Sequence, residues 1–197
     1  GCLVFKYLKR RNPDDVTAML VPLANTSVDV VSVLVGINDD LCWRGSPHGE
    51  LWGENMGTPP LQDLFPGGGA PTHTSSIGMN MVHSDLLQMN LAAMVDDGHD
   101  VFQLYLDRAR QTGLGLYASF RMNDAHRNME HRMADARRSA LLVSRPDLLI
   151  GSPAPYLASG YAEDFNFSWQ WDFAQPEVRQ RFLGLFDETL TRYDVDG

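Results

Sequence analysis

The chain has 197 residues, a formal net charge of −9 at pH 7 and 44% hydrophobic residues. This length allows one domain with a sizeable core, whereas the acidic balance argues against nucleic acid, whose phosphates attract basic surfaces. No run of roughly 18 or more apolar residues occurs, so we expect no membrane span. Cys2 and Cys42 form no Cys-x-x-Cys unit, and dinucleotide and phosphate-loop fingerprints are absent, so the sequence predicts no thiol site and no cofactor. The place of the protein in the cell stays open.

The N-terminal part of the chain predicts two strands with a helix between them. Residues 2–7 have the pattern of a first strand. Asn12 can cap the following helix, with Pro13 in its first turn, and Pro22 must kink or end that helix. Residues 28–36 are almost continuously apolar, which is typical of a strand covered on both faces of a sheet.

A long stretch rich in Gly, Pro, Asn, Ser and Thr follows the second predicted strand over residues 37–83. We interpret it as a functional loop or a disordered segment, because irregular segments of this length are otherwise uncommon inside a compact domain. Asp39 and Asp40 lie at its start, where ordinary turn chemistry is a better interpretation than ligand binding, although a ligand contact stays open. Residues 86–95 predict a short helix.

A helix and a strand are predicted next. Asp100 and Gln103 resemble a capping box at the start of a helix that Gly113 ends. Residues 114–120 then form the third predicted strand. Residues 127–145 are charged and amphipathic, which indicates a surface excursion.

Pro176 is predicted to start a long helix that runs into a buried strand. Its apolar residues at helical spacing are Val178, Phe182, Leu185, Phe186, Leu190 and Tyr193. Asp194 and Asp196 flank the start of the strand, and we interpret them as structural. The alternation along the chain favours an α/β domain with parallel strands.

The first group of candidate site residues follows the third predicted strand. It consists of Arg121, Asn123, Asp124 and His126. Polar groups at the carboxyl ends of parallel strands face the site in barrel enzymes, so we predict that these residues bind substrate. Two alternatives stay open: a strand-to-helix turn in which Asp124 is a helix cap, and a metal site at Asp124 and His126. We predict no metal, because no third ligand is near.

The second group lies in the aromatic segment 165–174. Trp169 and Trp171 suit stacking on sugar rings, and Asp172 can accept hydrogen bonds from hydroxyl groups, so we predict that all three bind substrate. The alternatives are that either tryptophan is a core residue and that Asp172 only caps the helix opened by Pro176.

A series of ordered motifs spans about residues 91 to 197. They are Asp97-Gly98-His99-Asp100, Asp107-Arg108-Ala109, Gly113-Leu114, Ala118-Ser119-Phe120-Arg121-Met122-Asn123-Asp124, Arg145-Pro146-Asp147-Leu148-Leu149-Ile150-Gly151, Trp171-Asp172-Phe173-Ala174-Gln175-Pro176-Glu177-Val178-Arg179 and Arg192-Tyr193-Asp194-Val195-Asp196-Gly197. Together they resemble glycosyl hydrolase-like family 10, whose members are mostly uncharacterised bacterial proteins related to glycoside hydrolases. The first 90 residues match this family poorly.

The resemblance implies a partial (β/α)8 TIM barrel with a long loop after its second strand. Residues 1–197 would form the N-terminal half of a single glycoside hydrolase-like catalytic domain that is incomplete at its C-terminus. We therefore expect a glycoside hydrolase that cleaves O-glycosyl bonds of a poly- or oligosaccharide, with its acid and nucleophile mainly beyond Gly197. A non-catalytic carbohydrate-binding barrel and a metal-dependent hydrolase are the alternatives.

Overall fold

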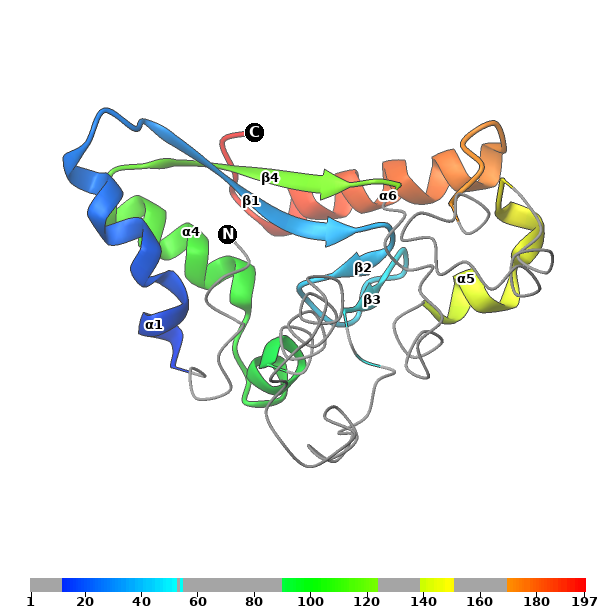
Figure 1. Cartoon of the computed structure of the whole chain (residues 1–197), viewed down its shortest axis with the longest axis horizontal. Coiled ribbons are helices and arrows are strands. Elements are labelled where there is room, and N and C mark those ends of the chain that lie inside the picture. The colour runs from blue at the N-terminus through cyan, green and yellow to red at the C-terminus, as the bar shows by residue number, and fades with distance from the viewer. Residues whose placement is uncertain (1–11, 53, 55–89, 124–138, 151–169) are drawn as a thin grey trace, which may run out of the picture.

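The computed structural model describes residues 12–52, 54, 90–123, 139–150 and 170–197 (Figure 1). Its elements are α1 (Pro13–Thr17), the 3₁₀ helix η2 (Ala18–Asn25), β1 (Val30–Ile37), β2 (Asp40–Leu41), β3 (Glu50–Leu51), α4 (Val101–Thr112), β4 (Gly115–Arg121), α5 (Ala140–Ser144), the 3₁₀ helix η6 (Pro146–Leu148) and α6 (Pro176–Arg192). Residues 90–96 are also helical and overlap the short helix expected at 86–95, whose first four residues lie outside the described part of the chain. The first strand expected at residues 2–7 lies outside the described residues.

The described strands form one small mixed sheet in the order β3-β2-β1-β4. β1 and β4 are parallel and pair from Val30 with Gly115 to Ile37 with Arg121. β2 is antiparallel to β1, and β3 is parallel to β2. Figure 1 shows the long β1–β4 pair side by side, with β2 and β3 at the end of β1.

The predicted partial (β/α)8 barrel is therefore wrong: the described part of the chain has an α/β fold with a small four-stranded mixed sheet. A barrel needs every strand to continue through a crossover into another parallel strand. After β1 the chain instead reverses through Asn38 and Asp39, so that Asp40 pairs with Ile37. Asn38 has φ 56°, a left-handed conformation that asparagine tolerates in two-residue hairpin turns. The segment expected to be only loop thus begins with two short strands.

α4 confirms the predicted helix and most of its cap. The Asp100 side chain accepts a hydrogen bond from the backbone N–H of Gln103 at 3.1 Å, and Gly113 ends the helix at φ 72°. The Gln103 side chain does not reciprocate as in a full capping box, because its amide donates to Asp107 at 2.8 Å instead. The buried positions on α4 are Val101, Phe102, Tyr105, Leu106 and Ala109.

α6 confirms the helix predicted from Pro176, with one difference in its buried stripe. Val178, Phe182 and Leu185 are buried as expected, but Leu190 is 64% exposed and Thr189 is buried in its place. The Thr189 hydroxyl donates to the carbonyl of Leu185 at 2.7 Å, which satisfies this polar group inside the core.

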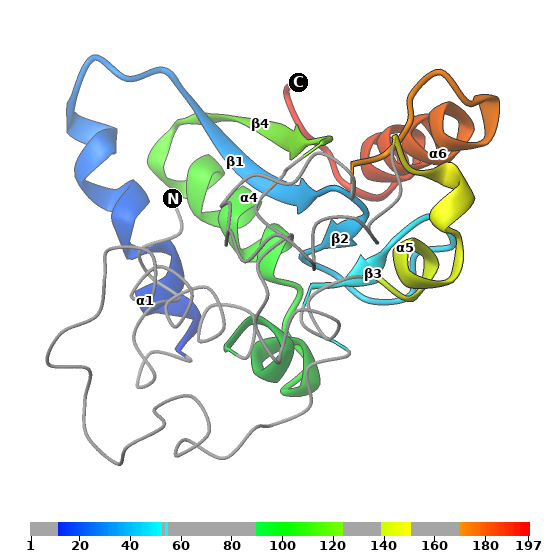
Figure 2. The same ribbon diagram turned by 45° about the vertical axis from the view of Figure 1, so that its right-hand side comes forward.

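α1 and η2 show how a proline changes a helix. Asn12 accepts a hydrogen bond from the N–H of Asp14 at 3.1 Å, as predicted for a cap. The α-helix ends at Thr17, and the chain continues as a 3₁₀ helix with Pro22 inside it. Val16 and Leu20 are buried, and Figure 2 shows α1 beside α4.

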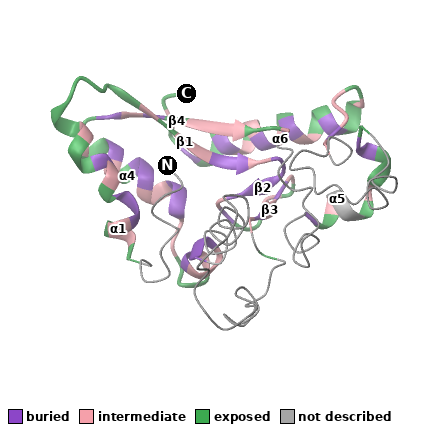
Figure 3. Ribbon diagram, viewed as in Figure 1, coloured by how far each residue is buried: buried purple, intermediate pink, exposed green. Residues whose placement is uncertain are grey.

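The two faces of the β1–β4 pair have different surroundings. One face carries Leu116, which is buried, and Phe120, whose ring meets that of Phe186 on α6 at 5.1 Å. The other face, which we call the open face, carries Val30 and Tyr117, each 45% exposed. Figure 3 colours β1 and β4 by the burial of each residue. The sequence predicted that residues 28–36 are covered on both faces of the sheet. This prediction is wrong for the first half of the segment, which is exposed on the open face.

The segment after α6 lies along the free side of β4. Asp196 N–H donates to the carbonyl of Leu116 at 3.0 Å, and Ala118 N–H donates to the carbonyl of Gly197 at 2.8 Å. The Asp196 carboxylate also accepts from the N–H of Leu116, and Asp194 forms an ion pair with Arg110. Both aspartates thus form structural contacts, as interpreted from the sequence.

Candidate functional site

The strand pairing places polar residues in one row at the carboxyl end of β1 and β4. Ile37 pairs with Arg121 on one side and with Asp40 on the other, and Asp40 pairs in turn with Glu50. Because residues paired across neighbouring strands point to the same face of a sheet, Arg121, Asp40 and Glu50 share the open face. We call these three residues the carboxyl-edge row.

The members of the carboxyl-edge row differ in their surroundings. Arg121 is exposed, whereas Asp40 is buried. The Glu50 carboxylate accepts the backbone N–H of Ala140, at 2.9 Å through Oε1 and 3.1 Å through Oε2. The row therefore combines an exposed arginine with a buried aspartate and a half-buried glutamate.

Asp39 lies on the opposite side of the sheet from Asp40 and is completely buried. Its Oδ2 is 3.3 Å from Nη2 of Arg181 on α6, whose side chain is itself mostly covered. A buried carboxylate needs a partner of this kind, because losing hydration without compensation is costly. The Asp39 side chain therefore anchors the turn after β1 to α6.

The backbone of the same turn joins two other strands. Asn38 N–H donates to the carbonyl of Arg121 at 2.8 Å, and the carbonyl of Asp39 accepts from the N–H of Glu50 at 2.9 Å. The turn thus contacts the end of β4, the start of β3 and the Arg181 side chain of α6. It therefore lies next to the carboxyl-edge row.

The structure brings Asn123 and Trp171 together, but through the Trp171 backbone. The Asn123 side chain accepts from Trp171 N–H at 3.0 Å and donates to the Trp171 carbonyl at 3.2 Å. The amide of Gln170 donates to the Asn123 carbonyl at 2.9 Å. Both ends of the Asn123 side chain are thus occupied by protein, and this residue ties β4 to residues 170–171.

The remaining predicted binding residues have different positions. Trp171 is 1% exposed, so stacking on a sugar would require its ring to leave the core. Asp172 is half-buried and accepts from the N–H of Ala174 at 2.9 Å, while Gln175 rather than Asp172 occupies the N-cap of α6. Asp124, His126 and Trp169 lie outside the described residues.

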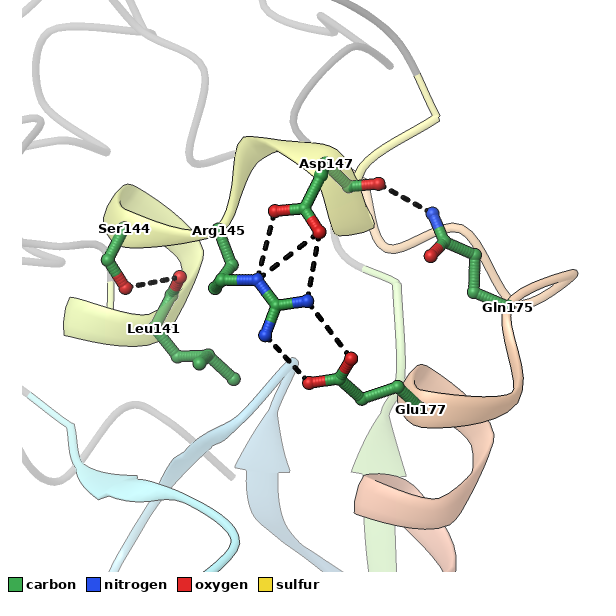
Figure 4. A network of polar contacts seen from close by, with 6 residues as sticks. All are labelled: Leu141, Ser144, Arg145, Asp147, Gln175 and Glu177. Carbon is green, nitrogen blue, oxygen red and sulfur yellow. Dashed lines mark hydrogen bonds and ion pairs between the residues drawn. The ribbon is translucent and has the colours of Figure 1, made fainter.

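An ion-pair network supports the segment that holds Trp171 (Figure 4). Arg145 contacts both carboxylates of Asp147 and Glu177, and these hydrogen bonds raise the pKa of the guanidinium and lower the pKa of Asp147. Trp171 forms an isolated bridge with Leu149, which directly follows η6. η6 precedes Leu149 in the chain, and α6 follows Trp171. The network thus links the two helices that flank the bridge.

Sequence reasoning missed two residues at this edge, Glu50 and Arg181. Glu50 lies in the stretch interpreted as loop, and nothing local marks it. Arg181 does leave a signal: it follows Val178 by three residues and precedes Leu185 by four, so it falls on the buried stripe of α6. A charged residue at such a position indicates a buried partner of opposite charge.

Within the described ranges, no group of three or more His, Cys, Asp or Glu side chains is placed to hold a metal ion. None of the helices there has both the length and the apolar character needed to cross a bilayer. No protein-family model matches the chain, and no curated protein is significantly similar to it.

Proposed function

We propose that the carboxyl-edge row binds a poly- or oligosaccharide and that the protein is a glycoside hydrolase. The observation that carries this proposal is the register that aligns Arg121, Asp40 and Glu50 on one face. Guanidinium and carboxylate groups form charge-assisted hydrogen bonds with hydroxyl groups, which cover the edges of a sugar. The motif resemblance between residues 91 and 197 also supports a carbohydrate substrate.

Two carboxyl groups are the chemical requirement for hydrolysing a glycosidic bond. They stand about 5 to 5.5 Å apart in retaining enzymes and about 6.5 to 9.5 Å apart in inverting ones. Asp40 and Glu50 occupy paired positions on neighbouring strands, so this edge offers two such groups. Arg121 would orient the sugar, and Asp172 is available as a further hydroxyl acceptor near Trp171.

The test measures binding and cleavage separately. Calorimetric titration with a panel of oligosaccharides should detect binding to the unmodified chain. Glu50→Gln should weaken it by about 1 to 3 kcal/mol through lost charge-assisted hydrogen bonds, because Glu50 is less covered than the buried Asp40. Asp187→Asn removes an exposed carboxylate on α6 and should leave affinity unchanged. Equal affinity in the wild type and Glu50→Gln would refute this site.

Release of reducing ends from the same oligosaccharides distinguishes a hydrolase from a binding protein. Binding without release would favour the non-catalytic carbohydrate-binding alternative. Release that a chelator abolishes would favour a metal-dependent hydrolase, for which Asp124 and His126 remain the candidate ligands. Failure to bind any sugar in the panel would argue against both carbohydrate proposals.

A further inference from the structure

The turn after β1 connects one buried ion pair to the carboxyl-edge row. Asp39 bonds to Arg181 of α6 through its side chain and to Glu50 through its carbonyl. On one side of Asp39, the N–H of Asn38 donates to the carbonyl of Arg121. On the other side, Asp40 is a member of the row. Asp39 and its two neighbours therefore contact three strands.

We propose that Arg181 is a positioning residue, which sets the geometry of the carboxyl-edge row through Asp39. The inference rests on the proposed function, because it assigns Arg181 a part in the binding of the same sugar. Arg181 itself lies on the opposite side of the sheet from the open face, so its proposed role is indirect.

The energetics of buried ion pairs favour a geometric role over a purely stabilising one. Apolar residues of similar volume in place of such a pair often leave a protein equally stable or more stable. Arg181 occupies a position on the buried stripe of α6 where an apolar residue would serve packing well. An ion pair, however, defines direction and distance, whereas apolar contacts tolerate sliding.

The turn gives this anchor a specific use. Asn38 is in a left-handed conformation that the chain adopts without the support of a glycine. Gly49 lies so close to the turn that a Cβ at this position would be 2.6 Å from the carbonyl oxygen of Asp39. The ion pair between Arg181 and Asp39 keeps this turn and the two carboxylates of the row in one arrangement.

The experiment compares Arg181→Met, Asp39→Asn and the double variant with the wild type. Arg181→Met alone should melt at a clearly lower temperature, because it leaves a buried carboxylate without its cation. The double variant should recover most of that loss. It should nevertheless bind oligosaccharide at least tenfold more weakly, and the amide NMR resonances of Glu50 and Arg121 should shift. The Arg121 shift is decisive, because Glu50 bonds directly to the carbonyl of the mutated Asp39 whereas Arg121 bonds to the unmutated Asn38.

Arg110→Met with Asp194→Asn is the matched control, because it removes an exposed ion pair far from the row. It should leave both resonances and the affinity unchanged. Arg181→Lys keeps the charge and should restore part of the affinity lost in Arg181→Met; it also replaces the double variant if that one does not fold. Unchanged resonances of Glu50 and Arg121 in the double variant would overturn the positioning role.

The two proposals fail in different ways. If the wild type binds no sugar but the resonances shift, the carbohydrate function fails and the positioning role stands. If the wild type binds and the double variant binds equally well, the positioning role fails while the binding site stands.

Discussion

At the scale of single residues, Gly49 shows how little space the backbone leaves beside the carboxyl-edge row. A Cβ at this position would lie 2.6 Å from the Asp39 carbonyl oxygen and 2.7 Å from Cδ1 of Leu41. The first of these atoms belongs to the backbone and cannot rotate away. The absence of a side chain at position 49 is therefore a packing requirement of the β2–β3 pair.

We predict that Gly49→Ala lowers the free energy of unfolding by about 1 to 3 kcal/mol, the usual cost of overpacking. Urea denaturation measures it. Gly115→Ala is the control in a strand of the same sheet, where the nearest atom to a new Cβ is the rotatable Cγ2 of Val30 at 3.2 Å. Equal stability of the two variants would contradict the prediction.

Cys42 provides a second test at this scale. Burial, with a smaller contribution from the Asp100 carboxylate, raises the pKa of its thiol far above the ordinary value. Since the thiolate is the nucleophile, we expect Cys42 in a Cys2→Ser background to resist iodoacetamide at pH 8 and to react readily in urea. Rapid alkylation of the folded protein would show that this thiol is accessible.

At the scale of elements, Asp100 joins the start of α4 to the end of α6. Its carboxylate caps α4 at Gln103 and also accepts the hydroxyl of Tyr193, at 2.9 Å through Oδ2. The Tyr193 ring lies edge-on to Phe102, with centroids 4.8 Å apart. One carboxylate thus serves as a helix cap and as a contact between two helices.

Asp100→Ala should lower the free energy of unfolding by about 2 kcal/mol, the sum of a lost cap and a lost hydrogen bond. Asn12→Ala removes an exposed cap on α1 and should cost about 1 kcal/mol or less. A double-mutant cycle with Tyr193→Phe isolates the hydroxyl contact. Additive effects in that cycle would mean that this contact adds no stability.

The Arg145 network connects η6 with α6 but is open to solvent (Figure 4). Exposed ion pairs contribute little, and salt screens them. We therefore expect Arg145→Ala to lower the melting temperature less than Asp100→Ala does. The remaining difference from the wild type should shrink in 1 M salt, where the Debye length is about 3 Å. A larger and salt-independent loss would indicate a role in packing.

At the scale of the whole molecule, the weakly acidic side chains of Cys42 and Tyr193 couple folding to alkaline pH. Burial is the largest cause that raises the pKa of both Cys42 and Tyr193, and the Asp100 carboxylate adds to it. Their ordinary pKa values are about 8.5 and about 10. Above these values the unfolded chain loses protons that the folded chain keeps, so the free energy of unfolding falls as pH rises.

We predict that Cys42 and Tyr193 change the urea midpoint little between pH 6 and pH 8. Their ionisation in the unfolded chain should lower the midpoint between pH 8.5 and pH 10.5. The double variant Cys42→Ala with Tyr193→Phe should lose part of this fall, because it has no ionisable group at either position. A midpoint that falls equally in the variant and the wild type would assign the effect to other residues.

The sequence by itself determined where most of the described helices and the two long strands lie. The cap at Asp100, the left-handed end at Gly113 and the apolar stripe of α6 are local signals, and they predicted α4 and α6 closely. The apolar run before Gly36 likewise predicted β1. Such signals need only residues within a few positions of one another, so they can be read without knowledge of the fold.

Only the tertiary structure decided how these elements combine. The reversal at Asn38 made β2 antiparallel to β1, and no composition rule distinguishes this turn from the start of a long loop. The same holds for Asp39 and Arg181, which lie 142 positions apart in the chain. Contacts across such separations depend on packing of the whole core, which decides whether a polar residue near a strand end meets a ligand, a helix or the backbone of another segment.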